Sequence, residues 1–141
     1  MTRLALLPAL LALAACGKPD VGPHTGGGGG ATAATYASIT TGLMVPRCAT
    51  GACHGGANPV AFPPCDADRW YAAMVDVESQ QAPGVKLIAP GDPDSSYLVH
   101  KLRGTHALVG GGGARMPIAD AALDDTEQAA VEAWISNGAT R

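Results

Sequence analysis

The residues best able to do chemistry lie together in one segment, Cys48-Ala-Thr-Gly-Ala-Cys53-His54-Gly-Gly. It combines two thiols with an imidazole that directly follows the second thiol. Two cysteines can bond to the vinyl groups on one edge of a porphyrin, and a histidine in this position can ligate the iron. The common spacing for that chemistry has two residues between the cysteines, whereas this sequence has four.

The four intervening residues, 49–52, are all small, and Gly51 can adopt positive φ. A widened loop of this kind can still present both sulfurs to one porphyrin edge. The same loop permits a local disulfide between Cys48 and Cys53, with His54 an ordinary loop residue. The adjacent histidine and the glycine pair after it, which removes bulk beside a flat macrocycle, favour haem.

A further metal-binding side chain lies downstream, at Met116 in a glycine-rich loop. Its thioether is a soft ligand that favours reduced iron, so it is the predicted sixth, distal ligand. His100 and His106 compete for that position, although we expect a structural role for each. Ligation by two histidines therefore stays open.

Cys65 lies outside residues 48–56, the segment proposed to attach the haem, which is called the attachment segment below. It could be a free thiol, an intermolecular link, or the disulfide partner of Cys48 or Cys53 in a domain without haem. A disulfide to either cysteine would consume a sulfur that the haem needs. Cys65 therefore favours the haem-free alternative.

The first 15 residues are typical of an export signal, with one arginine, an apolar run too short to span a bilayer comfortably, and small residues at its end. Leu13-Ala14-Ala15-Cys16 resembles a bacterial lipobox, which predicts cleavage before Cys16 and lipid attachment to its thiol. Residues 16–34 include five consecutive glycines and predict a flexible tether. We therefore expect an exported protein, anchored by lipid to a membrane on its periplasmic or outer face.

Residues 35–141 are expected to form one small all-α domain of about four helices with long loops around one haem. The first helix begins near Thr35, and Pro46 disfavours the helical conformation at Val45 before the chain reaches Cys48. The others are predicted within 66–77 (capped by Asp66 or Asp68), 95–104 and 124–137, with a capping box formed by Asp124 and Glu127. Residues 104–115 are predicted to be a loop.

Apolar residues recur at helical spacing in each of these segments and predict the core. The chain has only one Phe, three Tyr and two Trp, so a haem would supply apolar material that the domain lacks. The residues at this spacing are Tyr36, Ile39, Leu43, Met44, Trp70, Met74, Val77, Ala130, Val131, Trp134 and Ile135. Tyr97, Leu98, Lys101 and Leu102 fit the helix predicted within 95–104.

The order of these features is similar to that of class I cytochrome c domains: a helix, the cysteine pair with its histidine, PGDPDSSYLVHKL, RMP, and a helix ending AVEAWISNGA. It most resembles the shortened versions in exported proteins of environmental bacteria, some of which have a widened cysteine spacing. The resemblance covers roughly residues 35–140. It implies one haem c per chain, with thioether bonds to Cys48 and Cys53, His54 as proximal ligand and Met116 as distal ligand.

Together these features predict an electron-transfer module that works with a redox partner protein. A haem enzyme such as a peroxidase is a minor alternative, because Met116 would fill the position that such an enzyme keeps open. The alternative from another class is a haem-free, disulfide-bonded structural or binding lipoprotein domain. Nucleic acid is not an expected partner, since nine Lys and Arg against twelve Asp and Glu give a net charge of −3, with no basic block.

Overall fold

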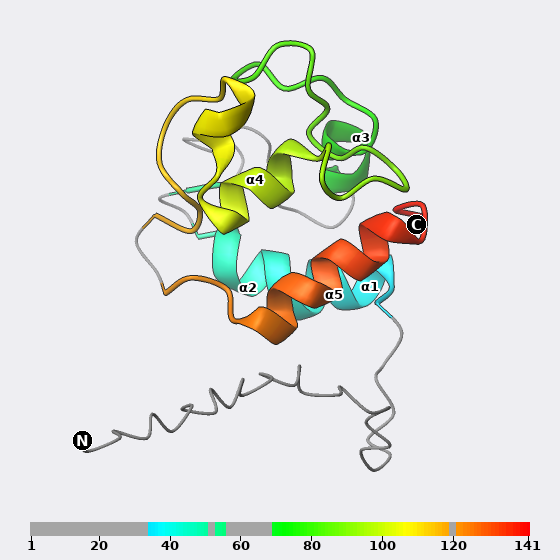
Figure 1. Ribbon diagram of the computed structural model, residues 1–141. Coiled ribbons are helices and arrows are strands. Elements are labelled where there is room, and N and C mark those ends of the chain that lie inside the picture. Colours follow the sequence, from blue (N-terminus) through cyan, green and yellow to red (C-terminus); the bar gives the residue numbers. More distant parts are fainter. Residues whose placement is uncertain (1–33, 51–52, 56–68, 119–120) are drawn as a thin grey trace, which may run out of the picture. The chain divides into compact units, whose positions relative to one another are not determined.

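Figure 1 shows the computed structural model of the 141-residue chain, which describes residues 34–50, 53–55, 69–118 and 121–141. The predicted export signal, Cys16, Cys65 and all of the predicted tether except Ala34 lie outside the described residues. No helix in the described ranges is long and apolar enough to cross a membrane.

The described part of the chain is helical. Its extended segments form isolated β-bridges and no strands, which confirms the prediction of a small all-α fold. In chain order the elements are α1 (Tyr36–Ile39), the π-helical turn η1 (Thr40–Met44), α2 (Val45–Cys48), α3 (Trp70–Met74), α4 (Tyr97–Arg103), the 3-10 helix η2 (His106–Val109) and α5 (Asp125–Ser136).

The elements α1, η1 and α2 follow one another directly and end at Cys48. Thr35 begins this run with a capping box, since its side chain accepts from the Ser38 amide and Ser38 reaches back to the Thr35 amide. The expectation that Pro46 disfavours the helical conformation at Val45 is wrong, because Val45 adopts φ −62° and ψ −50°. The Val45 amide donates to the Thr40 carbonyl, five residues back, so the turn is wider here. Pro46 then lies in the first turn of α2, where a missing amide hydrogen costs little.

An aromatic cluster joins the first, second and last helices. The rings of Tyr36, Trp70 and Trp134 lie in contact, with centroids 5.8 to 6.1 Å apart, and Tyr71 meets Tyr36 edge to face at 5.4 Å. Trp70 and Trp134 are 3% and 2% exposed. This confirms both tryptophans as core residues, in a chain that has few other aromatic side chains to bury.

The second predicted helix corresponds to α3 and is shorter than predicted. It begins after Arg69 and ends at Met74, because Val75 turns to an extended conformation and the next residues pair with a later segment. The Asp76 amide donates to the Ile88 carbonyl at 2.9 Å. Val77 therefore lies outside the helix and is half-buried. The predicted caps, Asp66 and Asp68, lie outside the described residues.

The third helix, α4, lies within its predicted range and ends at Gly104, which adopts φ +77°. Its buried residues are Tyr97, Val99, Lys101 and Leu102, whereas Leu98 is half-buried. The predicted loop after α4 contains η2, where a continuous loop was expected.

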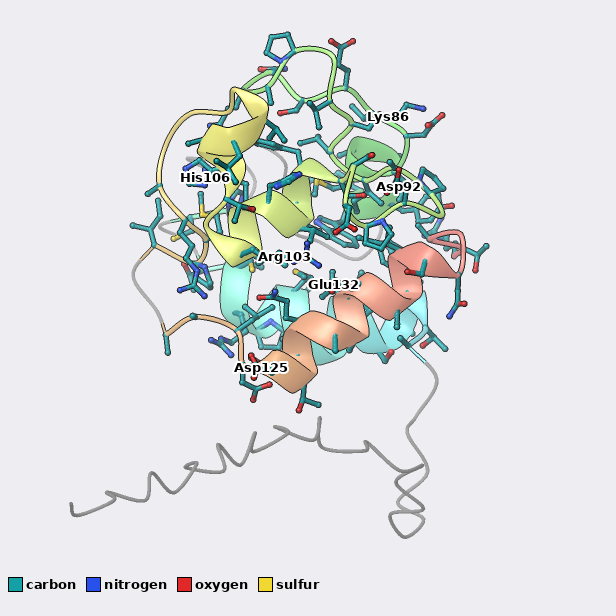
Figure 2. All side chains as sticks on the ribbon, in the orientation of Figure 1. Lys86, Asp92, Arg103, His106, Asp125 and Glu132 are labelled. Atoms are coloured by element: carbon teal, nitrogen blue, oxygen red, sulfur yellow. The ribbon has the colours of Figure 1, made fainter. Side chains whose placement is uncertain are left out.

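The last helix, α5, is confirmed with its predicted cap. The Asp124 carboxylate accepts from the Glu127 amide at 2.8 Å, and Glu127 accepts from the Asp124 amide at 3.0 Å. Glu127 also pairs with Arg47 at 2.8 Å, which ties α5 to α2. Arg103 of α4 pairs with Glu132 of α5 at 3.0 Å, and Figure 2 labels both side chains between the two helices.

Replacing Asp124 with alanine tests this cap. Asp124→Ala is expected to lower the free energy of unfolding by about 1 kcal/mol, because the Glu127 amide loses its acceptor. Urea unfolding with an unchanged m-value measures the effect. Asp124→Asn is the control, since its amide oxygen still accepts; equal stability of the two variants would contradict the capping role.

Candidate functional site

The attachment segment begins where α2 ends and turns back on that end. The His54 amide donates to the Cys48 carbonyl at 3.1 Å, although six positions separate them in the sequence. The amides of Cys53 and Gly55 both donate to the Thr50 carbonyl, at 2.9 and 3.0 Å. These three bonds hold the second cysteine and the histidine next to the helix end that carries the first cysteine.

Gly55 is required by the backbone of this turn. A Cβ atom built on it would lie 2.1 Å from the Ala49 carbonyl oxygen and 2.9 Å from that of Thr50. Real Cβ atoms do not approach so closely, so no larger residue fits without moving the chain. From the sequence, this glycine was expected to leave room for a flat macrocycle. The structure adds a separate reason for glycine here, which is the close approach of two backbone segments.

The side chains that carry the proposed chemistry are partly exposed. Cys48, Cys53 and His54 are all half-buried, and the two sulfurs are not joined to each other. Cys48 packs against the edge of the hydrophobic core. The third thiol of the predicted domain, Cys65, lies outside the described residues.

Met116 lies at the edge of the same core as Cys48 and is half-buried. Its amide donates to the Lys101 carbonyl at 3.0 Å, and the neighbouring Arg115 side chain donates to the Leu102 carbonyl at 2.8 Å. The segment that carries the thioether is thus held along α4. In Figure 1 this segment and the chain leaving α2 run on the same side of the view.

His100, one of the two competing histidines, has both ring nitrogens in hydrogen bonds. Its Nε2 donates to the Asp94 carbonyl at 2.9 Å, which leaves Nδ1 to accept from the Thr105 hydroxyl, also at 2.9 Å. Coordination of a metal would break one of these bonds. These two hydrogen bonds agree with the structural role expected for His100.

His106, the other histidine, lies on η2 (Figure 2) and is 9% exposed. Its Nε2 donates to the Gly113 carbonyl at 2.7 Å, so Nδ1 carries the lone pair. That nitrogen is buried and has no hydrogen-bond partner among the described residues. A buried acceptor without a donor is costly, so His106 keeps its place as the second candidate ligand.

Lys101 was predicted to lie within the third helix, and no role was predicted for it. Lys101 is 6% exposed; its ammonium donates to the Gly112 carbonyl at 3.1 Å and lies 5.9 Å from the centre of the Tyr97 ring. Burial lowers the pKa of the Lys101 ammonium and raises that of the Tyr97 hydroxyl. A lysine four residues after a buried tyrosine on one stripe was the available signal.

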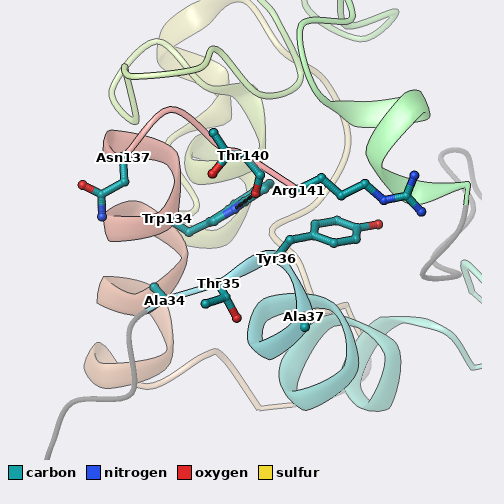
Figure 3. A pocket seen from close by; sticks show the side chains of 8 residues that line it. All are labelled: Ala34, Thr35, Tyr36, Ala37, Trp134, Asn137, Thr140 and Arg141. Carbon is teal, nitrogen blue, oxygen red and sulfur yellow. Dashed lines mark hydrogen bonds between the residues drawn. The ribbon is translucent and has the colours of Figure 1, made fainter.

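A pocket of about 290 Å³ lies elsewhere, at the start of α1 and the end of α5 (Figure 3). Tyr36 and Trp134 form its aromatic walls, and Arg141 lies over the Tyr36 ring, 5.7 Å from its centre. None of the residues predicted to bind a cofactor lines it. The pocket and the attachment segment are therefore separate features.

The chain was compared with known families and proteins. No family model, curated protein or solved structure matches it. The functional assignment of this chain therefore rests on its own residues and their arrangement.

Proposed function

We propose that this chain carries one covalent haem c and transfers electrons, and that it is an electron carrier rather than an enzyme. The observation that carries the proposal is the turn at the end of α2, closed by the hydrogen bond from His54 to Cys48. Covalent attachment needs two sulfurs at one porphyrin edge and an imidazole beside the second sulfur. A segment that returns to its own start supports that placement despite the four intervening residues.

The donor set of the described residues fits the group. Among those residues, no three His, Cys, Asp or Glu side chains are grouped to hold a bare metal ion. His54 and Met116 would supply ligands to an iron that a macrocycle also holds. One is an imidazole and the other a soft thioether, a pair that raises the reduction potential of haem iron.

When bound, the haem supplies a one-electron couple between ferric and ferrous iron. Cys48 and Cys53 would hold it, and the core against which Cys48 and Met116 pack would limit the access of water. A low-dielectric surrounding disfavours the extra positive charge of ferric iron, so burial favours the reduced form. His106 is the second candidate for the distal position, because of its buried Nδ1.

A redox partner protein and a membrane anchor complete the proposal. The anchor is placed at Cys16, so that the domain works on the periplasmic or outer face. Leu108 on η2 is 83% exposed and Ile118, two residues after Met116, is 68% exposed. Single exposed apolar side chains are common on protein surfaces, so these two do not locate the contact with the partner.

The first test is covalent haem. The protein, produced in a host with cytochrome c assembly machinery, is expected to keep haem after denaturation, read by haem peroxidase staining of a gel and by intact mass. The double variant Cys48→Ser/Cys53→Ser is expected to lose all of it, because no thioether can form.

Cys65→Ser is the matched control for this experiment and is expected to retain the haem. A wild-type mass that corresponds to the polypeptide alone, with a disulfide, would instead support the haem-free structural or binding lipoprotein.

Met116→Ala tests the distal ligand. Loss of the thioether is expected to change the visible spectrum and to lower the reduction potential, since methionine favours ferrous iron. Met74→Leu is the control, a buried methionine in α3, and is expected to leave both unchanged. An unchanged spectrum in Met116→Ala would move the assignment to His106, which His106→Ala would then test.

Cys16→Ser tests the anchor. The variant is expected to move from the membrane fraction to the soluble fraction, because a lipid chain can no longer attach to residue 16. Fractionation followed by immunoblotting measures it against the wild type. A variant that stays with the membrane would rule out lipidation at this residue.

A further inference from the structure

We infer that Lys101 is the positioning residue that fixes Met116 for the iron, through two separate contacts with the segment Gly112–Met116. The inference rests on the proposed function, because it concerns the predicted distal ligand. It assigns a role to a buried lysine that neither attachment nor ligation uses.

The same residue holds the segment at both of its ends. The Lys101 carbonyl accepts from the Met116 amide at 3.0 Å, and the Lys101 ammonium donates to the Gly112 carbonyl at 3.1 Å. The residues between these two points cannot move away from α4 unless one of the bonds breaks. Lys101 therefore closes a clamp around the segment that carries the thioether.

Burial of this ammonium is costly, and its hydrogen bond to the segment offsets part of that cost. The side chain is almost fully buried, and no ion pair to a carboxylate is found for it among the described residues. Its contacts are a neutral carbonyl and the face of Tyr97. Opening of the segment would take the Gly112 carbonyl away from the ammonium, so the lysine favours the closed arrangement, which an apolar side chain of similar length would not do.

Neighbouring residues support the same segment at single points. The Tyr97 hydroxyl lies 3.2 Å from the Gly112 carbonyl, His106 donates to the Gly113 carbonyl at 2.7 Å, and Arg115 donates to the Leu102 carbonyl. Gly111 passes close to Tyr97, since a Cβ there would lie 2.3 Å from its ring. Of these residues, Lys101 is the one that acts at both Gly112 and Met116.

The clamp sets how easily the thioether leaves the iron. An external ligand can bind iron only in the fraction of molecules whose Met116 segment is open, so its apparent affinity rises when opening becomes easier. Removal of one charged hydrogen bond makes opening easier by an amount that corresponds to roughly a tenfold change in that fraction.

The experiment measures imidazole binding to the ferric protein by visible spectroscopy. Lys101→Met keeps the apolar stem and deletes the donor, and it is expected to increase imidazole affinity about tenfold. Two controls are expected to leave the affinity unchanged. Lys86→Met makes the same chemical change at an exposed lysine paired with Asp76, and Ile135→Val weakens the core of α5 without touching the clamp.

Tyr97→Phe is the second variant, in case Lys101→Met does not fold. It deletes only the hydroxyl near the Gly112 carbonyl and is expected to raise imidazole affinity about threefold. Wild-type affinity in each of these clamp variants that folds, with haem retained, would overturn the inference. So would a matching rise in Ile135→Val, because the effect would then follow general stability.

Amide hydrogen exchange at Met116 separates this inference from the proposed function. In the protein as purified, whatever its cofactor content, exchange of the Met116 amide is expected to be about tenfold faster in Lys101→Met than in the wild type. If no haem attaches but this acceleration is found, the clamp stands and the electron-transfer proposal fails. If exchange is unchanged, the clamp fails.

Discussion

The hydrogen bond from the His54 amide to the Cys48 carbonyl closes the attachment segment, and the candidate site depends on it. It allows four residues to separate the cysteines while the histidine still returns to the end of α2. This return is possible because residue 55 is glycine. The Ala49 carbonyl lies where the Cβ atom of any other residue would be. A backbone hydrogen bond, and not a particular side chain, thus returns His54 to the end of α2 despite the four residues between the cysteines.

The remaining elements bring a second segment to the same core. Tyr36, Trp70 and Trp134 pack the first, second and last helices together, and α4 lies against α5 through Arg103. The segment from Gly112 to Met116 is then attached to α4 by hydrogen bonds to its backbone and to Lys101. Both sulfur-bearing segments therefore derive their positions from short helices that share one small core.

Local patterns predicted the helices well where local interactions determine them. The capping box at Asp124 and the spacing of Tyr36, Ile39 and Leu43 involve residues within one or two turns, and α5 and the first helical run follow them. The end of α3 was missed because pairing of Asp76 with a later segment sets it. The role of Lys101 and the Gly113 partner of His106 were not predicted for the same reason, since both partners are backbone carbonyls of a glycine loop that no side-chain pattern marks.

Glu127 performs two tasks with one carboxylate. It accepts from the Asp124 amide at the start of α5. Both of its carboxylate oxygens also accept from Nη1 of Arg47, in the helix that carries Cys48. Fraying of the first turn of α5 would withdraw the carboxylate from Arg47 at the same moment. The start of α5 is far from Cys48 in the sequence but is coupled to it through this ion pair. The first turn of α5 and the end of α2 should therefore loosen together on heating.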